Sequence, residues 1–143
     1  MGRIVYISPD SKVVRSPDVS AMQALVINPP PGYWLSGSGS GSIEFEDGAS
    51  RRCLLLLPNE TYGIYLKYIV FKNGVARETW LSLQDRTMLS KVCECSDEWY
   101  ASIGLFLPRN IAWLGIQEFL KTGKRSENVN WIQPVELPDG GNW

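Results

Sequence analysis

Two long apolar runs joined by Asn73-Gly74 constrain the fold of this chain more than any other feature of its sequence. The first run, TYGIYLKYIVF, ends at Phe71, and the second, VARETWLSL, begins at Val75. Both runs are rich in aromatic and β-branched residues, which pack well on a pleated surface. Asn-Gly tolerates the positive φ angles of a type I′ turn, which joins antiparallel strands. The pattern therefore predicts an antiparallel β-hairpin in the middle of the chain.

Further strand patterns flank this hairpin. RRCLLLL, residues 51–57, is apolar on both faces, as expected of a strand at the centre of a sheet. IEFED, residues 43–47, alternates apolar and acidic residues and leads into an Asp47-Gly48 turn. We also expect strands in GRIVYIS, MLSKVCEC and VNWIQP, and a weaker one in EWYASIGLFL.

Two helices are predicted, one toward each end of the chain. SPDVSAMQALVINPPPG, residues 16–32, predicts a helix with Ser16 as its N-cap and Val19, Met22 and Val26 facing the core. PRNIAWLGIQEFLK, residues 108–121, predicts a second helix, with Gly123 as its left-handed cap. Its apolar residues fall within an arc of about 120° and are Ala112, Trp113, Ile116, Phe119 and Leu120.

Together these patterns predict the fold class α+β: an antiparallel β-sheet meander of about five or six strands, with an N-terminal and a C-terminal helix packed on it. A length of 143 residues fits one domain, residues 1–143. We expect residues 138–143 to form a flexible tail. We expect SGSGSGS, residues 36–42, to be a mobile loop or a glycine-rich edge leading into the next strand.

Charge and hydropathy narrow the classes of partner. The net charge is −1, which disfavours direct nucleic-acid binding because that class usually carries a basic excess. No apolar run approaches the ~20 residues that a membrane span needs, and the N-terminus lacks the pattern of a secretory signal. The expectation is therefore a cytoplasmic protein that does not bind a membrane.

The chain contains no histidine and three cysteines. Cys93 and Cys95 would share one face of a strand, but no histidine completes a four-ligand zinc site. Ser–His and Cys–His nucleophile pairs are excluded for the same reason. We therefore predict structural or surface thiols, no metal, no cofactor and no enzymatic activity. An enzyme that uses Ser, or Asp/Glu with Lys, is the remaining catalytic alternative, supported only by the abundance of those residues.

The sequence Thr122-Gly123-Lys124 looks like the end of a phosphate-binding loop, but its context excludes that function. A P-loop requires glycine five residues before the second glycine, and Glu118 stands there. Arg125 replaces the required Ser or Thr. The glycine also follows a helix instead of opening one, so the negative end of the helix dipole would face the phosphate.

The same region resembles a signature of a known family. The pattern Phe-x-x-Thr-Gly-x-Arg followed by Val-x-Trp is similar to the C-terminal signature of immunity proteins that accompany bacterial polymorphic toxins, including those of contact-dependent growth inhibition systems. The resemblance extends over residues 33–133 and is sharp at 119–131, although Ser126 stands where the family commonly has Pro. The matching residues are Phe119, Thr122, Gly123, Arg125, Val129 and Trp131.

The resemblance implies a mostly β, non-enzymatic antitoxin. Such a protein binds a cognate toxin domain, a nuclease or deaminase, and blocks its active site or substrate entry. It implies an architectural role for the six signature residues. Neither the identity of the toxin, the binding surface nor the oligomeric state follows from it.

Inhibitors of nucleic-acid enzymes often present carboxylates to a basic substrate groove, and aromatic side chains are frequent interface anchors. Two acidic segments therefore supply candidate toxin-binding residues, with ordinary solvated turns as the alternative interpretation. The candidates are Glu44, Glu46 and Asp47 in IEFEDG, and Asp97, Glu98, Trp99 and Tyr100 in SDEWY.

A second function from a different class is a ligand- or peptide-binding β module unrelated to toxins. Aromatic residues in the central strands, Tyr62, Tyr65, Tyr68 and Trp80, motivate it. Cross-strand packing is the alternative explanation for these side chains. A neighbouring toxin gene would favour the immunity protein over this module.

Overall fold

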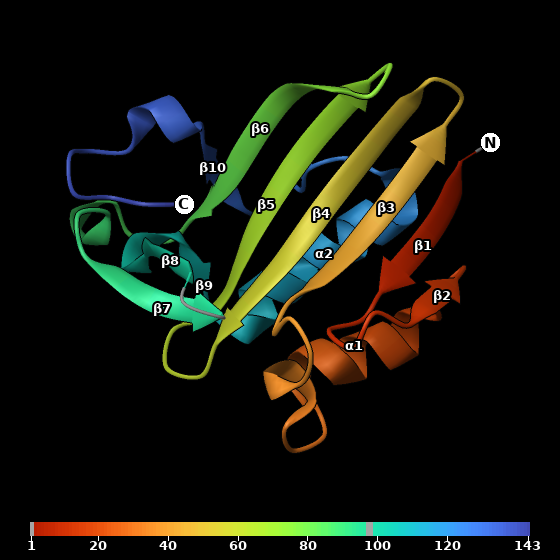
Figure 1. The fold of residues 1–143 in the computed structure, drawn as a ribbon, viewed down its shortest axis with the longest axis horizontal. Coiled ribbons are helices and arrows are strands. Elements are labelled where there is room, and N and C mark those ends of the chain that lie inside the picture. Colours follow the sequence, from red (N-terminus) through yellow and green to blue (C-terminus); the bar gives the residue numbers. More distant parts are fainter. Residues whose placement is uncertain (1, 97–98) are drawn as a thin grey trace.

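The predicted central hairpin forms the middle of the sheet (Figure 1). The computed structural model describes residues 2–96 and 99–143. β4 (Ser50–Asn59) pairs along its length with β5 (Gly63–Lys72), which pairs with β6 (Val75–Leu83). Asn73 and Gly74 have φ angles of 52° and 78°, as a type I′ turn requires. The hairpin prediction is confirmed.

Within the described residues, one eight-stranded sheet follows the order β10-β6-β5-β4-β3-β1-β2, and β9 pairs with β5. A separate two-stranded sheet joins β7 and β8. All the pairings are antiparallel. The remaining strands are β1 (Arg3–Ile7), β2 (Val13–Arg15), β3 (Gly41–Asp47), β7 (Val92–Ser96), β8 (Trp99–Ser102), β9 (Phe106–Leu107) and β10 (Asn130–Ile132).

The α+β class is confirmed, but the expected five or six strands are too few. Strands of two or three residues, such as β2 and β9, are too short to show a period-two pattern in the sequence. Short 3₁₀ turns at residues 33–35, 86–88, 103–105 and 134–136 connect several elements.

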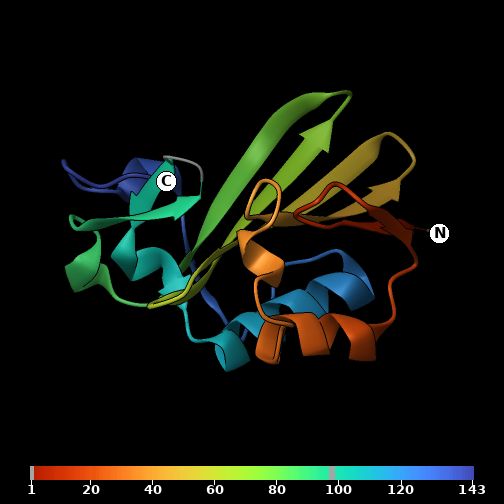
Figure 2. The ribbon, with the colours of Figure 1, turned by 60° about the horizontal axis from the view of Figure 1, so that its bottom comes forward.

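Two helices, α1 (Val19–Ile27) and α2 (Arg109–Thr122), pack on the same face of the sheet (Figure 2). All five residues predicted for the buried face of α2 are buried, so this prediction is confirmed. Gly123 ends α2 with a φ angle of 72°, and its N–H donates to the Phe119 carbonyl at 2.8 Å. The predicted left-handed cap is therefore present.

The main core lies between the sheet and the two helices. Along β4 and β5, alternate residues such as Leu54, Leu56 and Leu66 face the helices and are fully buried. Edge-to-face packing of Tyr68 on Phe119, with ring centroids 6.0 Å apart, joins the sheet to α2. Because aromatic pairs in this geometry are stabilising beyond their buried area, this contact is a central part of the core.

The beginning of α1 differs from the prediction. Asp18 is the N-cap, and its carboxylate accepts a hydrogen bond from the Ala21 N–H at 2.9 Å. Ser16 instead follows β2 with a φ angle of 49°. Met22 and Val26 are buried as expected, whereas Val19 is 46% exposed. The expected position of Val19 is wrong because the helix begins there, beyond the edge of the core.

The C-terminal segment, expected as a flexible tail, is attached to β8. The Asn142 carbonyl accepts from the Ser102 N–H at 2.8 Å, and the Asn142 N–H donates to the Ser102 hydroxyl at 2.9 Å. Lys67 places its ammonium 3.9 Å from the centre of the Trp143 ring. No local sequence pattern indicates these contacts, because Ser102 and Lys67 are distant in the sequence from Asn142 and Trp143.

A second, smaller core lies on the other face of the sheet, beneath the β7–β8 hairpin. Tyr65 stacks on Trp99 with ring centroids 6.2 Å apart. Within the described residues, the buried Tyr65 hydroxyl has no hydrogen-bond partner. A buried, unpaired polar group costs about 1–3 kcal/mol, so this hydroxyl should reduce stability.

Tyr65→Phe is therefore expected to leave the free energy of unfolding unchanged or to raise it by about 1 kcal/mol. Urea denaturation measures this change. Tyr6→Phe is the matched control, because the Tyr6 hydroxyl is 2.7 Å from that of Tyr33, and its loss should lower stability by about 1 kcal/mol. A clear loss of stability in Tyr65→Phe would contradict the assignment of an unpaired hydroxyl.

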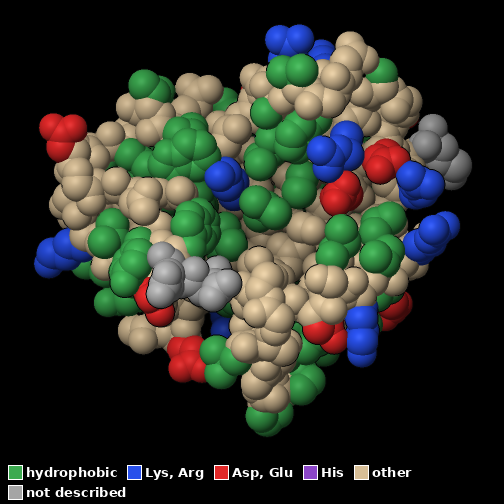
Figure 3. Space-filling view, in the orientation of Figure 1, with side chains coloured by type: hydrophobic (Ala, Val, Ile, Leu, Met, Phe, Trp, Pro, Cys, Tyr) green, Lys and Arg blue, Asp and Glu red, His purple; other side chains and the backbone are tan. Residues whose placement is uncertain are grey.

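Among the described residues, no helix covers the rest of the face opposite α1 and α2 (Figure 1), and Figure 3 shows hydrophobic and charged side chains side by side on this face. Apolar side chains on this surface, including Ile69 and Phe71, are half-buried and lie among charged residues. No helix in residues 2–96 and 99–143 is long and apolar enough to cross a membrane.

Candidate functional site

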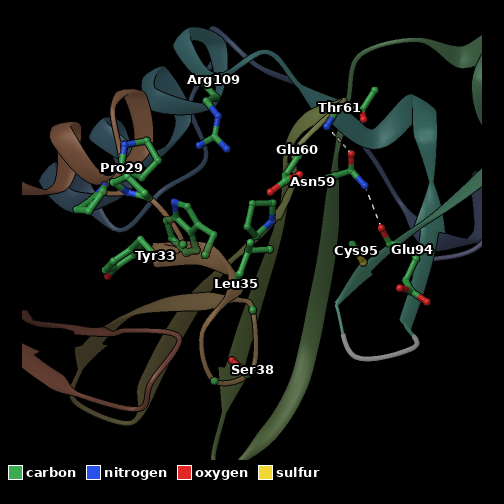
Figure 4. Close-up of a pocket in the computed structure, with 17 residues that line it drawn as sticks. Pro29, Tyr33, Leu35, Ser38, Asn59, Glu60, Thr61, Glu94, Cys95 and Arg109 are labelled. Atoms are coloured by element: carbon green, nitrogen blue, oxygen red, sulfur yellow. Dashed lines mark hydrogen bonds between the residues drawn. The ribbon is translucent and has the colours of Figure 1, made fainter.

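A cleft of about 630 Å³ opens where the β4–β5 turn approaches the proline-rich loop after α1 (Figure 4). One wall is residues 29–39, which we call the proline-glycine loop. The other wall is the turn around Asn59, together with Glu94 and Cys95 of β7. Arg109, at the start of α2, completes the lining. The cleft thus joins four segments that are far apart in the sequence.

The proline-glycine loop is held in place by specific contacts. Trp34 is buried, and its indole N–H donates to the Leu25 carbonyl at 3.0 Å. The Ser38 N–H donates to the Pro9 carbonyl at 2.9 Å. Gly37 has a φ angle of 53°, and a Cβ there would lie 2.0 Å from the Pro9 oxygen. The SGSGSGS segment therefore needs glycine for this close approach to Pro9, and it leads into β3 as expected.

The opposite wall is organised by Asn59. Its side-chain oxygen accepts from the N–H groups of Thr61 and Tyr62 at 2.8 and 3.1 Å. Its side-chain nitrogen donates to the Glu94 carbonyl at 2.9 Å. Asn59 therefore shapes the β4–β5 turn and also ties it to β7. The residues Asn-Glu-Thr are a local sequence pattern that indicates a turn. No local pattern indicates the contact between Asn59 and β7.

Charged groups line both sides of the cleft. Glu60 and Glu94 are exposed. Figure 4 shows that the Glu60 carboxylate and the Arg109 guanidinium both point toward the cavity. Arg109 donates to the Val26 carbonyl at 2.9 Å, and burial lowers the pKa of its guanidinium. The Glu94 carboxylate points away from the cavity at its rim (Figure 4), so the charged residues of the lining are two acids and one cation, of which Glu60 and Arg109 face the cavity.

Apolar surface accompanies these charges. Leu35 is 72% exposed at the end of the short 3₁₀ turn in the proline-glycine loop, and Figure 4 places it beside the cavity. An exposed apolar side chain next to carboxylates suits a protein surface that carries both apolar and basic groups.

Two observations bear on metal binding and thiol chemistry near the cleft. Residues 2–96 and 99–143 contain no group of three or more His, Cys, Asp or Glu side chains that could hold a metal ion. Burial raises the pKa of the nearby Cys93 thiol, which disfavours the reactive thiolate.

The predicted acidic candidates of IEFEDG lie at the other end of β4 from the cleft. Glu44 forms an ion pair with Arg51 at 2.9 Å, and Glu46 forms one with Arg3 at 2.6 Å. Asp47 is exposed at the end of β3. Because Glu44 and Glu46 already have cationic partners, their pull on a basic partner is reduced. The structure does not bring this group together with the cleft.

The candidates of SDEWY divide differently. Asp97 and Glu98 lie outside the described residues. Trp99 is half-buried and stacks on Tyr65, so its main contacts are internal. Tyr100 is 46% exposed, and its carbonyl accepts from the Asn142 side chain at 2.9 Å. Glu60, Glu94 and Arg109 are the residues of the cleft that sequence reasoning missed.

The signature residues pack around Tyr68 and not at the cleft. Phe119 and Trp131 both contact the Tyr68 ring. The Arg125 guanidinium lies 4.0 Å from the centre of the Trp80 ring. The described residues that line the cleft include none of the six. In the structure these residues stabilise the junction of α2, β10 and the sheet.

Ser126, which departs from the resembled family, has a structural role of its own. It is 3% exposed, and its hydroxyl accepts from the Asn128 N–H at 3.0 Å. Its carbonyl accepts from the Trp131 indole at 3.0 Å. These two hydrogen bonds hold the turn before β10.

Comparisons with known proteins add no family assignment. No family model, no curated protein and no solved structure matches this chain.

Proposed function

We propose that this chain is a cytoplasmic immunity protein that binds and neutralises a bacterial toxin domain, a nuclease or deaminase, through the cleft. The single structural observation that carries the proposal is the acidic, partly apolar cleft. The sequence signature supplies the class of partner, and the cleft supplies a surface with suitable chemistry. Inhibition would follow from covering the toxin's active site or the entry for its substrate.

The chemistry of the cleft supports this partner in particular. An enzyme that acts on nucleic acid needs a basic substrate groove, because phosphate contacts supply much of its affinity. Glu60 in the cleft and the exposed Glu94 at its rim would meet that groove, and the exposed Leu35 would add an apolar contact. Complementary charge also speeds association, which benefits an inhibitor of a toxic enzyme.

The first test is direct binding. Candidate toxin domains, beginning with any that a neighbouring gene encodes, are mixed with the purified chain, and complex formation is measured by calorimetry. We expect a stoichiometric complex at micromolar concentration and loss of the toxin's activity. Absence of any association would overturn the proposed function and would favour a ligand- or peptide-binding β module.

The second test locates the surface. Glu60→Lys combined with Glu94→Lys should weaken the complex by about tenfold or more and flatten its salt dependence, because rim charges act mainly on association. The matched control is Glu127→Lys with Asp139→Lys, two exposed acids outside the cleft lining. Equal effects of the two double variants would reject the cleft while leaving the immunity function in place.

A further inference from the structure

The edge of the sheet at β2 combines features that a monomer does not require. β2 is the last strand of the sheet (Figure 1), and its Val13 and Val14 are 60% and 43% exposed. Beside it lies a slot of about 240 Å³, lined by Val14, Ala21 and Leu25 among others. Exposed apolar residues at an unpaired strand edge are typical of association surfaces.

The backbone of β2 has a defined pattern of available groups. Lys12 and Ser16 bond to β1, since the Lys12 carbonyl accepts from Ser8 and the Ser16 N–H donates to Ile4. In an antiparallel pair these bonds alternate along the strand, so the N–H and C=O groups of Val13 and Arg15 point outward. They are two residues apart and symmetric about Val14.

Helix α1 adds a second, independent observation. Its nine residues, VSAMQALVI, include no charged residue, although only Met22 and Val26 are buried. Val19, Ala21 and Ala24 are exposed. A surface helix normally carries charged residues on its solvent side. Figure 2 shows α1 below the β1–β2 edge, so one partner could cover the strand and the helix together.

We propose that two copies of the chain associate through antiparallel pairing of their β2 strands about a twofold axis at Val14. Val13 of each copy then pairs with Arg15 of the other, which uses both outward-facing residues of each strand. The joined sheets bring the two α1 helices side by side and cover the slots. An extended peptide would account for the strand and the slot but not for the uncharged helix.

The charges at this edge are compatible with self-association. Asp10 and Asp18 balance Lys12 and Arg15, so two copies meet without net repulsion. β2 has only three residues, and its backbone pairing alone would make few hydrogen bonds. The small and apolar residues of α1 must therefore supply part of the contact, and variants of that helix should also affect association.

Sedimentation equilibrium tests the proposal without a toxin, and its outcome is independent of the proposed function. The average mass should rise from 16.1 kDa toward twice that value as concentration increases.

Val14→Asp places two carboxylates opposite each other, and like charges at opposed strand positions are destabilising, so this variant should remain monomeric. Ala21→Glu should do the same through α1, while Val75→Asp, at an exposed valine on β6, should leave association unchanged. A mass of 16.1 kDa for the unmodified chain at every concentration would overturn the proposal.

Cross-linking fixes the register. Opposed residues of a non-hydrogen-bonded antiparallel pair have Cα atoms about 4.5 Å apart, within the range for a disulfide. Val14→Cys should therefore form a covalent dimer under mild oxidation, at a rate well above that of the unmodified chain with its three cysteines. Equally fast cross-linking of Val75→Cys would indicate random collision and would contradict the assigned pairing.

Discussion

Phe119→Ala is expected to lower the free energy of unfolding by about 3–5 kcal/mol. The Phe119 side chain is 1% exposed in the main core and packs edge-on against Tyr68. Truncation removes the buried apolar surface of the ring and leaves a cavity between α2 and β5, which the helix and sheet cannot close without moving. Chemical denaturation, monitored by tryptophan fluorescence, measures the loss.

Leu114→Ala is the control on the same helix. Leu114 is 37% exposed, and we expect a change within about 0.5 kcal/mol, as for most surface substitutions. The comparison separates core packing from helix formation, since both positions receive alanine. Similar losses at the two positions would contradict the assignment of Phe119 to the core.

Gly123→Ala is expected to cause the second largest loss, for two additive reasons. The φ angle of 72° is one that an L-residue adopts only at a cost of about 1–3 kcal/mol. In addition, a Cβ at this position would lie 2.8 Å from the Phe45 ring, so the ring or the helix end must shift. Overpacking of this kind typically costs a further ~1–3 kcal/mol.

Gly74→Ala separates the backbone cost of a positive φ angle from the steric cost of the contact with Phe45. Its φ angle is 78°, close to that of Gly123, but no atom lies within 4 Å of a Cβ there. It should therefore show the conformational cost alone, and the difference between the two variants measures the contact with Phe45. Thermal and urea unfolding of both proteins provide the values. If Gly123→Ala costs no more than Gly74→Ala, the close approach of Phe45 is not a constraint.

Phe119 and Gly123 both belong to the resembled signature, and in this structure both act in packing and in chain geometry. Phe119 fills the core and Gly123 ends the helix. Both residues lie at the junction of α2 with the sheet, and neither of them lines the cleft. Variants at this junction should act on stability, whereas Glu60→Lys and Glu94→Lys should act on association.

Sequence reasoning predicted the elements whose signals are local. The Asn73-Gly74 turn, the buried face of α2 and the Gly123 cap each depend on a few neighbouring residues. Prediction was less accurate where a strand is very short, as for β2 and the total number of strands. It was also less accurate where two residues could serve as the helix N-cap, as at the start of α1. A three-residue strand has no period to detect, and both Ser16 and Asp18 are acceptable N-cap residues.

The sequence candidates and the residues of the cleft differ for another reason. Acidic and aromatic residues were selected because they are adjacent in the chain, as in IEFEDG. In the structure, Glu44 and Glu46 are held by Arg51 and Arg3. Glu60, Glu94 and Arg109 come from three elements and form the cleft together.

The sequence by itself determined the α+β class, the central hairpin, the position of α2 and the absence of histidine chemistry, because turn geometry, residue periodicity and side-chain type are local properties. Only the tertiary structure decided which charged groups share a surface, where the chain end attaches and which strand edge stays unpaired. Those features depend on contacts between residues far apart in the chain, and such contacts form only when the core fixes the relative positions of the sheet, the helices and the loops.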